Sequence, residues 1–108
     1  MKFNKIRLLG HLGKDPISFK SKNDLLIVRF SIATNEGYGS HKKKKTLWHE
    51  IVAFGKTAEL ALKLLKKGSK VFLEGKLNYN VYEDKDGKKR SKACIILEQF
   101  LLIHSKKE

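Results

Sequence analysis

The residues best suited to chemistry in this chain are aromatic rings set among lysines. Tyr38 precedes a run of four lysines at residues 42–45, and Trp48, Phe54 and Lys56 follow it. Ammonium groups can pair with phosphates, and flat rings can stack on bases of any kind. These residue types together favour binding to a single-stranded polynucleotide without reading its sequence. The cations of the run are Lys42, Lys43, Lys44 and Lys45.

The overall charge supports a polyanionic partner. The chain has 24 Lys+Arg against 11 Asp+Glu, which gives a formal net charge of +13 on 108 residues. Charge of one sign opposes compaction through self-repulsion, so a counter-charge is expected. Nucleic acid is the first expectation for so basic a domain. The alternative is a basic surface that serves only solubility.

Length and composition bound the architecture and the compartment. With 108 residues and 41% hydrophobic residues, the chain can bury one small core and is expected to form one domain. The single cysteine, Cys94, can form neither an internal disulfide nor a thiolate metal site, which favours a reducing compartment. Arg7, His11 and Lys14 interrupt the apolar residues near the start. Neither a signal peptide nor a membrane span is therefore expected.

Alternation of apolar and polar residues predicts a chain made mainly of strands. Strands are expected at residues 6–12, 25–34, 46–54, 71–82 and 91–103. Glycine, serine and lysine residues between 35 and 45 predict a long polar loop, and residues 84–87 predict a hairpin turn. Gly75, inside the fourth strand, is expected at a bulge or sharp bend.

One segment has a helical pattern, from Thr57 to Lys67. Ala58, Ala61, Leu62 and Leu65 can line its apolar face. Glu59 is expected in the first turn, and Gly68 just beyond the end suits a C-terminal glycine.

Five strands with one helix between the third and the fourth is the order of the OB-fold. This fold is a partly open five-stranded barrel that binds oligonucleotides on one face. We therefore expect an all-β domain with a single helix over residues 1–104, followed by a short basic end at 105–108 that has no acidic tail.

The alternation of side chains along a strand predicts the face from which each candidate ring leaves. Trp48 and Phe54 have the same parity on one strand, so both side chains can leave the same face and act as successive platforms. The alternative is that they are core residues, as most aromatic residues in small barrels are. Tyr79 and Tyr82 have opposite parity, so only one of them shares the face of the platforms, and Tyr82 is favoured.

Catalysis is not expected. His49 could be proposed as a catalytic or metal-binding residue, yet the histidines form no ligand spacing with one another or with Cys94, so a structural role is favoured. No phosphate-binding loop or nucleophile motif is present. The sequence therefore predicts no enzyme, no metal and no cofactor.

The lysine run at residues 42–45 could also be a solvated loop tip. Such a loop could close over the DNA backbone when DNA arrives.

A series of short motifs runs in order along nearly the whole chain. They are Asn4-Lys5-Ile6, Leu9-Gly10, Leu12-Gly13, Asp15-Pro16, Ala33-Thr34-Asn35-Glu36, Trp48-His49, Phe54-Gly55-Lys56, Lys67-Gly68-Ser69 and Leu73-Glu74-Gly75. In order and spacing, from Asn4 to Ile103, they closely resemble the bacterial and mitochondrial single-stranded DNA-binding proteins. Each motif is weakly specific alone, whereas the whole set in register is specific.

The resemblance implies a homotetramer that wraps single-stranded DNA over aromatic and basic residues. Trp48 and Phe54 match stacking positions of the family, Tyr38 stands where a stacking tryptophan is frequent, and Tyr82 occupies another aromatic position. Lys56 and Lys67 match basic positions along the DNA path, and Lys70 is a further candidate. The resemblance places His49 near the subunit contact, where it would hydrogen-bond across monomers.

The chain also departs from the family pattern. Asn78, Asn80 and Val81 stand where many relatives have basic residues, and Glu50 stands where arginine is common. The end of the sequence, from Ile103 to Glu108, lacks the flexible linker and acidic tip through which bacterial relatives recruit other enzymes. Recruitment through such a tail is therefore not expected, unless a tail has been removed.

The function expected from these features is binding and protection of single-stranded DNA in replication, recombination and repair. The alternatives are a primosomal replication-restart protein, an RNA-binding OB-fold protein and, more remotely, a small nuclease. The expected location is the bacterial cytoplasm with the nucleoid, or alternatively the mitochondrial matrix.

Overall fold

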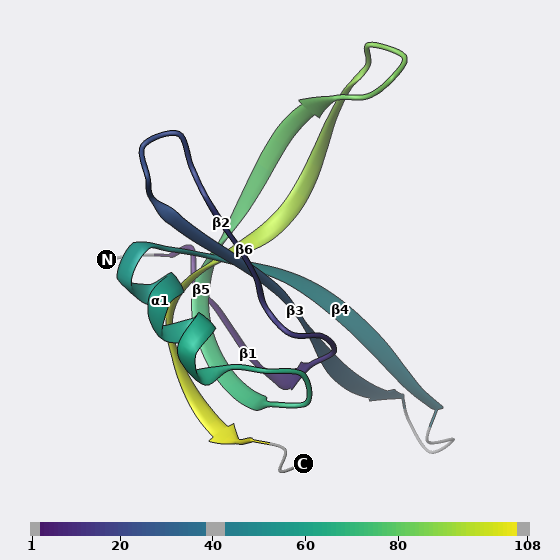
Figure 1. Ribbon diagram of the computed structural model, residues 1–108. Coiled ribbons are helices and arrows are strands. Elements are labelled where there is room, and N and C mark those ends of the chain that lie inside the picture. Colours follow the sequence, from purple (N-terminus) through teal and green to yellow (C-terminus); the bar gives the residue numbers. More distant parts are fainter. Residues whose placement is uncertain (1–2, 39–42, 106–108) are drawn as a thin grey trace.

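The computed structural model describes residues 3–38 and 43–105, and for residues 37, 38, 43 and 44 it describes the backbone alone. Figure 1 shows long, strongly curved strands with one helix against them. The elements in chain order are β1 (Ile6–Leu12), β2 (Ile17–Lys20), β3 (Leu26–Tyr38), β4 (Lys43–Phe54), α1 (Gly55–Leu64), β5 (Lys70–Glu83) and β6 (Lys89–His104).

Five of the strands close into a ring. Strand β1 pairs antiparallel with both β3 and β5, β5 pairs with β6, and β3 pairs with β4. A short parallel pairing of β4 with β6, at Ile51↔Ile95 and Val52↔Ile96, completes the ring. The helix α1 follows β4 and precedes β5. This order confirms the expected OB-fold barrel.

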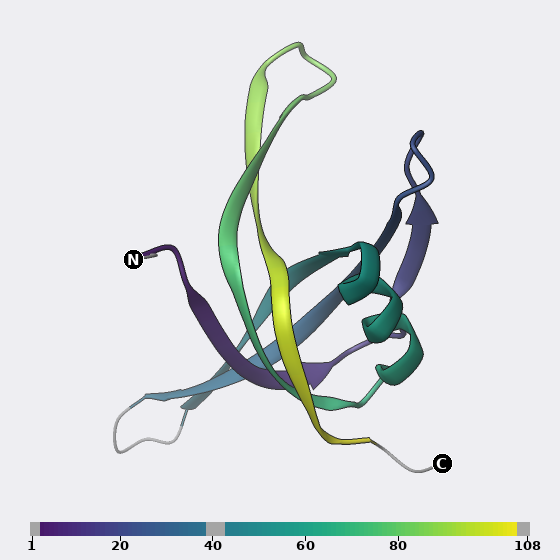
Figure 2. The ribbon, with the colours of Figure 1, turned by 90° about the vertical axis from the view of Figure 1, so that its left-hand side faces the viewer.

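Alternation along the strands builds the core. Val28, Phe30 and Ile32 of β3 point inward and are buried, as are Ile51 and Ala53 of β4. Burial of a large aliphatic side chain stabilises a fold by roughly 1.5–3 kcal/mol, so these strand positions fix which face turns inward. Two alanines of α1, Ala58 and Ala61, are fully buried and pack against the same cluster, where Figure 2 shows the helix lying beside the strands.

The helix lies earlier than the sequence pattern predicts. It runs from Gly55 to Leu64 rather than from residue 57 to 67, so Glu59 lies beyond the first turn. Leu65 already has extended backbone angles and is buried, whereas Leu62, also expected on the apolar face, is exposed. The following residues form a turn instead of a helical end, because the N–H of Gly68 donates to the Leu12 carbonyl at 2.9 Å. Gly68, at φ 87°, serves this turn and is not a helix cap.

The long loop expected at residues 35–45 is largely a hairpin, so that prediction is wrong. β3 continues to Tyr38 and β4 begins at Lys43, with register partners that include Asn35↔Thr46 and Glu36↔Lys45. The hydroxyl of Thr46 donates to Asn35 Oδ1 at 3.0 Å, which ties the two strands together. Backbone pairing satisfies the main chain whatever the side-chain polarity, so a polar composition did not prevent strand formation.

Strand β2 is a second difference, since no strand was expected there. It pairs with β3 through Ile17↔Arg29 and Phe19↔Ile27 and forms the edge of the sheet. Its four residues are all exposed, so there was no buried face to produce an alternating pattern.

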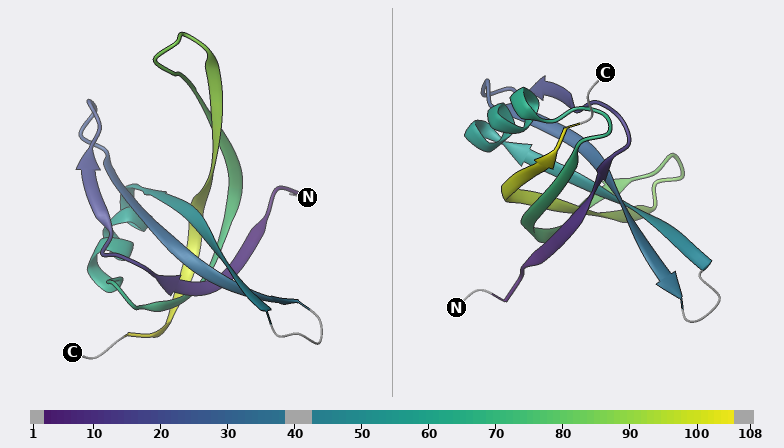
Figure 3. Two further views of the ribbon diagram at one scale, coloured as in Figure 1. Left: turned by 90° about the vertical axis from the view of Figure 1, so that its right-hand side faces the viewer. Right: turned by 90° about the horizontal axis from the view of Figure 1, so that it is seen from below.

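Strands β5 and β6 extend beyond the ring as a long two-stranded arm, which Figure 3 shows from two sides. Its turn was predicted correctly: Asp84 Oδ1 accepts the N–H groups of Asp86 and Lys88 at 2.9 Å each, and Gly87 has φ 76°. The bulge predicted at Gly75 is confirmed by a register shift between Glu74 and Gly75. A Cβ at Gly75 would collide with the carbonyl oxygen of Ile96.

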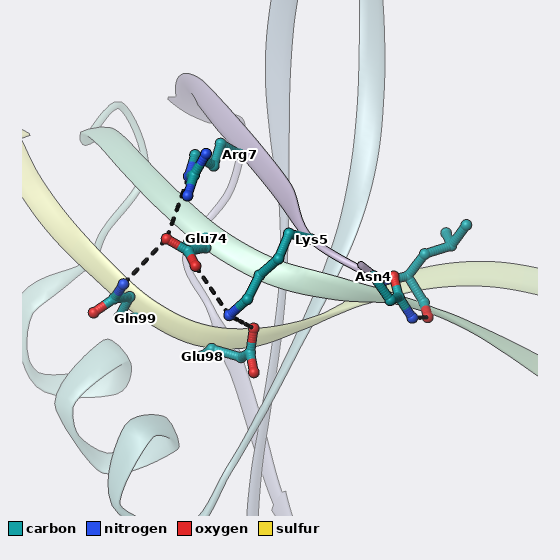
Figure 4. A network of polar contacts seen from close by, with 7 residues as sticks. Asn4, Lys5, Arg7, Glu74, Glu98 and Gln99 are labelled. Carbon is teal, nitrogen blue, oxygen red and sulfur yellow. Dashed lines mark hydrogen bonds and ion pairs between the residues drawn. The ribbon is translucent and has the colours of Figure 1, made fainter. Parts of the chain in front are cut away.

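A polar network joins β1, β5 and β6 on the outside of the ring (Figure 4). The ammonium group of Lys5 lies 3.0 Å from carboxylate oxygens of both Glu74 and Glu98. Glu74 also pairs with Arg7 at 3.4 Å and accepts the Gln99 side-chain amide at 3.1 Å. Hydrogen bonds from Lys5 and then Gln99 hold the pKa of Glu74 below its ordinary value.

This lowered pKa predicts an acid-dependent loss of stability. The ordinary pKa of Glu74 is 4.5. Above this pH the carboxylate is ionised in both the folded and the unfolded chain, and its hydrogen bonds and ion pairs stabilise the folded chain fully. As the pH falls further, the unfolded chain takes up the proton first, so stability is lost down to the folded pKa. Urea unfolding at pH 6 and at pH 3 is expected to show a larger fall in midpoint for the unmodified chain than for Glu74→Gln. Equal falls in the two proteins would contradict this role of Glu74.

Candidate nucleic-acid interface

Strand β4 presents two aromatic rings on its outer face. Trp48 is 61% exposed and Phe54 is 40% exposed, whereas Ile51 and Ala53, of the other parity, are buried. The prediction that both rings leave the same face of one strand is therefore confirmed, and neither ring belongs to the core. Their spacing of six residues corresponds to about 20 Å along an extended strand.

The Trp48 ring lies across the backbone of Gly13. A Cβ built at Gly13 would be 2.6 Å from the Cη2 and Cζ3 atoms of the indole. The ring therefore lies against the backbone after β1, and a side chain at position 13 would force the ring to move. This contact fixes a largely exposed ring in place, which is what a stacking platform requires.

Trp48 borders an open hollow of about 890 Å³ between the outer faces of β2, β3 and β4. A smaller hollow of about 220 Å³ adjoins it on the side of Phe54. Phe19, Arg29 and Glu50 line both, so the two hollows adjoin at these side chains, and together they are called the groove below. The larger hollow is lined by Gly13, Lys14, Asp15, Ile17, Phe19, Arg29, Phe30, Ser31, Trp48 and Glu50, and the smaller by Phe19, Ile27, Arg29, Glu50, Val52, Phe54, Asn80, Lys92 and Cys94.

An ion-pair cluster lies in the middle of the groove. Glu50 Oε1 pairs with the guanidinium of Arg29 on β3, and Glu50 Oε2 lies 3.0 Å from Lys92 Nζ on β6. Arg29, Glu50 and Lys92 are called the Glu50 cluster below. It carries two positive charges and one negative charge, so this part of the groove has a net charge near +1.

Among the other predicted site residues, Tyr82 and Tyr79 leave the β5–β6 arm on opposite faces, as predicted. No register shift separates them, and both are exposed. Tyr82 has the parity of Asn80, which lines the smaller hollow, so it shares the face of the groove. Lys70 lies twelve residues from Tyr82, on the order of 40 Å along the same strand, and lines neither hollow.

Two predicted lysines lie on either side of helix α1: Lys56 at its start and Lys67 in the turn that follows it. Lys56 is exposed in the first turn of α1, two residues after Phe54. The backbone N–H of Lys67 donates to Asp15 Oδ1 at 2.8 Å. Because Asp15 lines the larger hollow, Lys67 lies near that end of the groove.

The lysine run is only partly within the described residues. Lys45 is exposed on β4, opposite Glu36. Lys43 and Lys44 belong to β4, where Lys43 is the register partner of Tyr38. Lys42 lies outside the described residues.

His49 has a partner within its own chain. Its Nε2 lies 2.8 Å from the Thr34 hydroxyl, across the β3–β4 pair. It points toward the inner side of β4, with the parity of Ile51, rather than into the groove.

Among residues 3–38 and 43–105, no three His, Cys, Asp or Glu side chains gather as a metal site would require. Nor does the described part of the chain contain a helix long and apolar enough to cross a membrane.

The groove residues that sequence reasoning did not propose as contacts include an exposed ring and two cations, namely Phe19, Arg29 and Lys92. Arg29 could have been found, because it interrupts an apolar strand at an outward position. Phe19 belongs to the unpredicted strand β2. Lys92 reaches Glu50 only because β4 and β6 pair in parallel, far apart in sequence.

Comparison with known proteins gives a consistent picture. Residues 3–103 match the model of the single-strand binding protein family. The chain is 36% identical over 107 residues to single-stranded DNA-binding protein 1 of Chlorobaculum tepidum, covering 95% of this chain and 66% of the relative. It is 34% identical over 111 residues to the single-stranded DNA-binding protein of Neisseria meningitidis, covering 100% of this chain and 64% of the relative. The chain thus spans about two thirds of the length of these bacterial relatives.

A mitochondrial relative and a solved structure extend the comparison. The mitochondrial single-stranded DNA-binding protein of Mus musculus is 34% identical over 112 residues, covering 94% of this chain and 74% of the relative. A structure of the Plasmodium falciparum SSB in complex with single-stranded DNA superimposes with a TM-score of 0.86 at 28% identity. That superposition covers 96% of this chain and 97% of the other.

Proposed function

The chain belongs to the single-strand binding protein family, and from that premise we propose that it binds single-stranded DNA without regard to base sequence and protects it in replication, recombination and repair. One observation carries the proposal: two exposed rings, Trp48 and Phe54, lie on one face of β4 along a groove with cations at its centre. The solved relative with single-stranded DNA supports the same partner.

The proposed mechanism needs no chemistry on the DNA. Bases stack on the exposed rings, and each stacked base contributes about 1–3 kcal/mol whatever its identity. Cations along the path pair with phosphates and release counterions. In this proposal the protein is a non-enzymatic binder without a cofactor. The DNA-contacting residues are Tyr38, Lys42, Lys43, Lys44, Lys45, Trp48, Phe54, Lys56, Lys67 and Tyr82, joined by Phe19, Arg29 and Lys92 from the groove, with Lys70 as a more distant candidate.

The test uses the intrinsic fluorescence of the protein. Trp48 is the only tryptophan of the chain, so its emission reports on one site. Titration with a dT oligomer is expected to quench this emission to a plateau, and duplex DNA of the same length is expected to quench it far less. A U oligomer in a third titration distinguishes a DNA binder from an RNA binder. Unchanged emission at saturating dT, with binding also absent by anisotropy, would overturn the proposed function.

We also propose that the chain assembles as a homotetramer. Leu9 of β1, Phe72 of β5 and Leu101 of β6 are direct register partners across three neighbouring strands, and all three are exposed. Scattered apolar residues on a surface are ordinary, but a contiguous patch across a sheet indicates a contact surface. A second copy of this chain would cover the patch. We propose that His49 lies near a contact between copies, where the family resemblance puts it.

Leu101→Asp is expected to dissociate the assembly. An exposed side chain contributes little to the fold of one chain, but a charge at the centre of an apolar contact is costly. Light scattering at micromolar concentration is expected to give the mass of four chains for the unmodified protein and a smaller mass for the variant. Leu60→Asp, at an exposed leucine of α1, is the matched control and should remain a tetramer. A monomeric unmodified protein would contradict the tetramer.

The relatives also guide the proposed location. Relatives come from bacteria and from a mitochondrion, and both compartments contain DNA that becomes single-stranded. We place the protein with the nucleoid in the bacterial cytoplasm, with the mitochondrial matrix as the alternative.

A further inference from the structure

The Glu50 cluster sets an acidic residue in the middle of a groove otherwise suited to a polyanion. Arg29 and Glu50 line both hollows of the groove, and Lys92 lines the smaller one. Glu50 also lies on the outer face of β4 between Trp48 and Phe54, with the same parity. A strand of DNA that stacks on both rings must therefore pass over the cluster.

Burial decides what the DNA would meet there. The Glu50 side chain is only 20% exposed, whereas Arg29 is 47% exposed and Lys92 is 61% exposed. The carboxylate thus lies lower in the groove, and the two cations extend from neighbouring strands on either side of it. Each carboxylate oxygen is engaged by one cation.

We propose that Glu50 is an internal competitor of the DNA backbone: it occupies the two central cations of the groove and lowers the affinity for single-stranded DNA at that point. This inference rests on the proposed function. A phosphate that approaches Arg29 and Lys92 must share them with a carboxylate, which repels it. Glu50 thereby sets how tightly the centre of the groove holds DNA, while the rings on either side supply stacking.

Two effects of removing the Glu50 charge oppose each other. Without the carboxylate, Arg29 and Lys92 recover rotamer freedom, which makes each of them less well placed for a phosphate. However, Arg29 and Lys92 are themselves about half exposed, and ion pairs of solvent-accessible cations hold their members only weakly in salt solution. The repulsion between the carboxylate and a phosphate is removed entirely. The charge effect is therefore the larger one, and binding should tighten.

The test compares Glu50→Gln with the unmodified protein on a dT oligomer across a range of salt concentrations. Removal of a unit repulsion at about 4 Å changes affinity roughly fivefold at the dielectric constant of water, so a gain of about that size is expected at low salt. The slope of log affinity against log salt is expected to steepen by about 0.7 for each cation freed for a phosphate, and so by up to about 1.4 for two.

Three controls make the result specific. Glu59→Gln removes the same charge from an exposed position on α1 and should change neither affinity nor slope by a comparable amount. In a Lys92→Gln background, Glu50→Gln should steepen the slope by only about 0.7, because one cation remains. The gain should be equal for dT, dA and dC oligomers, since phosphates carry no base identity. Circular dichroism and urea unfolding establish that each variant is folded.

Each outcome has a defined meaning. Weaker or unchanged binding by folded Glu50→Gln, or a gain equal to that of Glu59→Gln, would overturn the inference while leaving the proposed function intact. A gain confined to one base would also overturn it, because the carboxylate would then contact base edges. Failure of the unmodified protein to bind dT at all would instead overturn the proposed function.

Discussion

Replacing Trp48 with alanine is expected to weaken the binding of a short dT oligomer by about 1–3 kcal/mol, or roughly 5- to 150-fold, for the one base stacked on this ring. The ring is 61% exposed and lies across the Gly13 backbone, so it is held ready for a base without being part of the core. Loss of the ring removes this stacking surface and leaves the backbone of Gly13 in place. The measurement is fluorescence anisotropy of labelled dT, because the variant has no tryptophan emission.

Two comparisons separate stacking from other effects of this substitution. Trp48→Phe retains a ring and is expected to recover most of the lost affinity, whereas Trp48→Leu retains bulk without a π-face and is not. The salt slope should be nearly the same in all variants, since a ring releases no counterions. An affinity for folded Trp48→Ala equal to that of the unmodified protein would show that DNA does not use this platform.

The barrel could be predicted from the sequence wherever burial enforces a period of two. Val28, Phe30 and Ile32 alternate because each must enter the core, and the same constraint placed Trp48 and Phe54 on the outside. Beyond the core this constraint ends. The hairpin formed by the far ends of β3 and β4 is held by backbone pairing, which leaves no trace in side-chain polarity.

The limits of the helix show a different kind of failure. Local pattern extended α1 to Lys67, because the leucines and lysines there suit a helix. The chain instead leaves the helix at Leu65, whose side chain is buried, and turns so that Gly68 donates to Leu12 of β1. A contact between residues more than fifty positions apart therefore decides where the helix ends, and a local reading of the sequence has no access to it.

The residues of the candidate site also fall into those that a local pattern predicts and those that only the fold brings together. Its rings were predicted because parity on a single strand is a local property. The Glu50 cluster was not, because it joins β3, β4 and β6 through one antiparallel and one parallel pairing. Glu50 could be identified as a departure from the family pattern, but the two cations that engage it became evident only in three dimensions. Non-local electrostatics is thus the part of this site that depended on the structure.

Replacing Lys42, Lys43, Lys44 and Lys45 together with glutamine is expected to change the salt dependence of binding more than any other variant. A lysine ammonium is a compact point charge suited to phosphates, so these four residues are expected to act through phosphates rather than through base edges. At about 0.7 per neutralised phosphate, loss of four contacts makes the slope of log affinity against log salt shallower by up to about 2.8. Between 50 and 200 mM salt, that difference corresponds to roughly 50-fold in affinity.

The measurement is a set of anisotropy titrations at several salt concentrations with dT, dA and dC oligomers. The loss at low salt should be nearly equal for all three, in contrast to a change at a base-reading site. A control with four other lysines replaced, Lys20, Lys22, Lys63 and Lys85, carries the same change in net charge, and none of these four lines the groove. If the run acts only as solvated charge, both variants will give the same small change in slope. The basic track would then lie with Lys56, Lys67 and the Glu50 cluster, because those cations lie near the stacking rings.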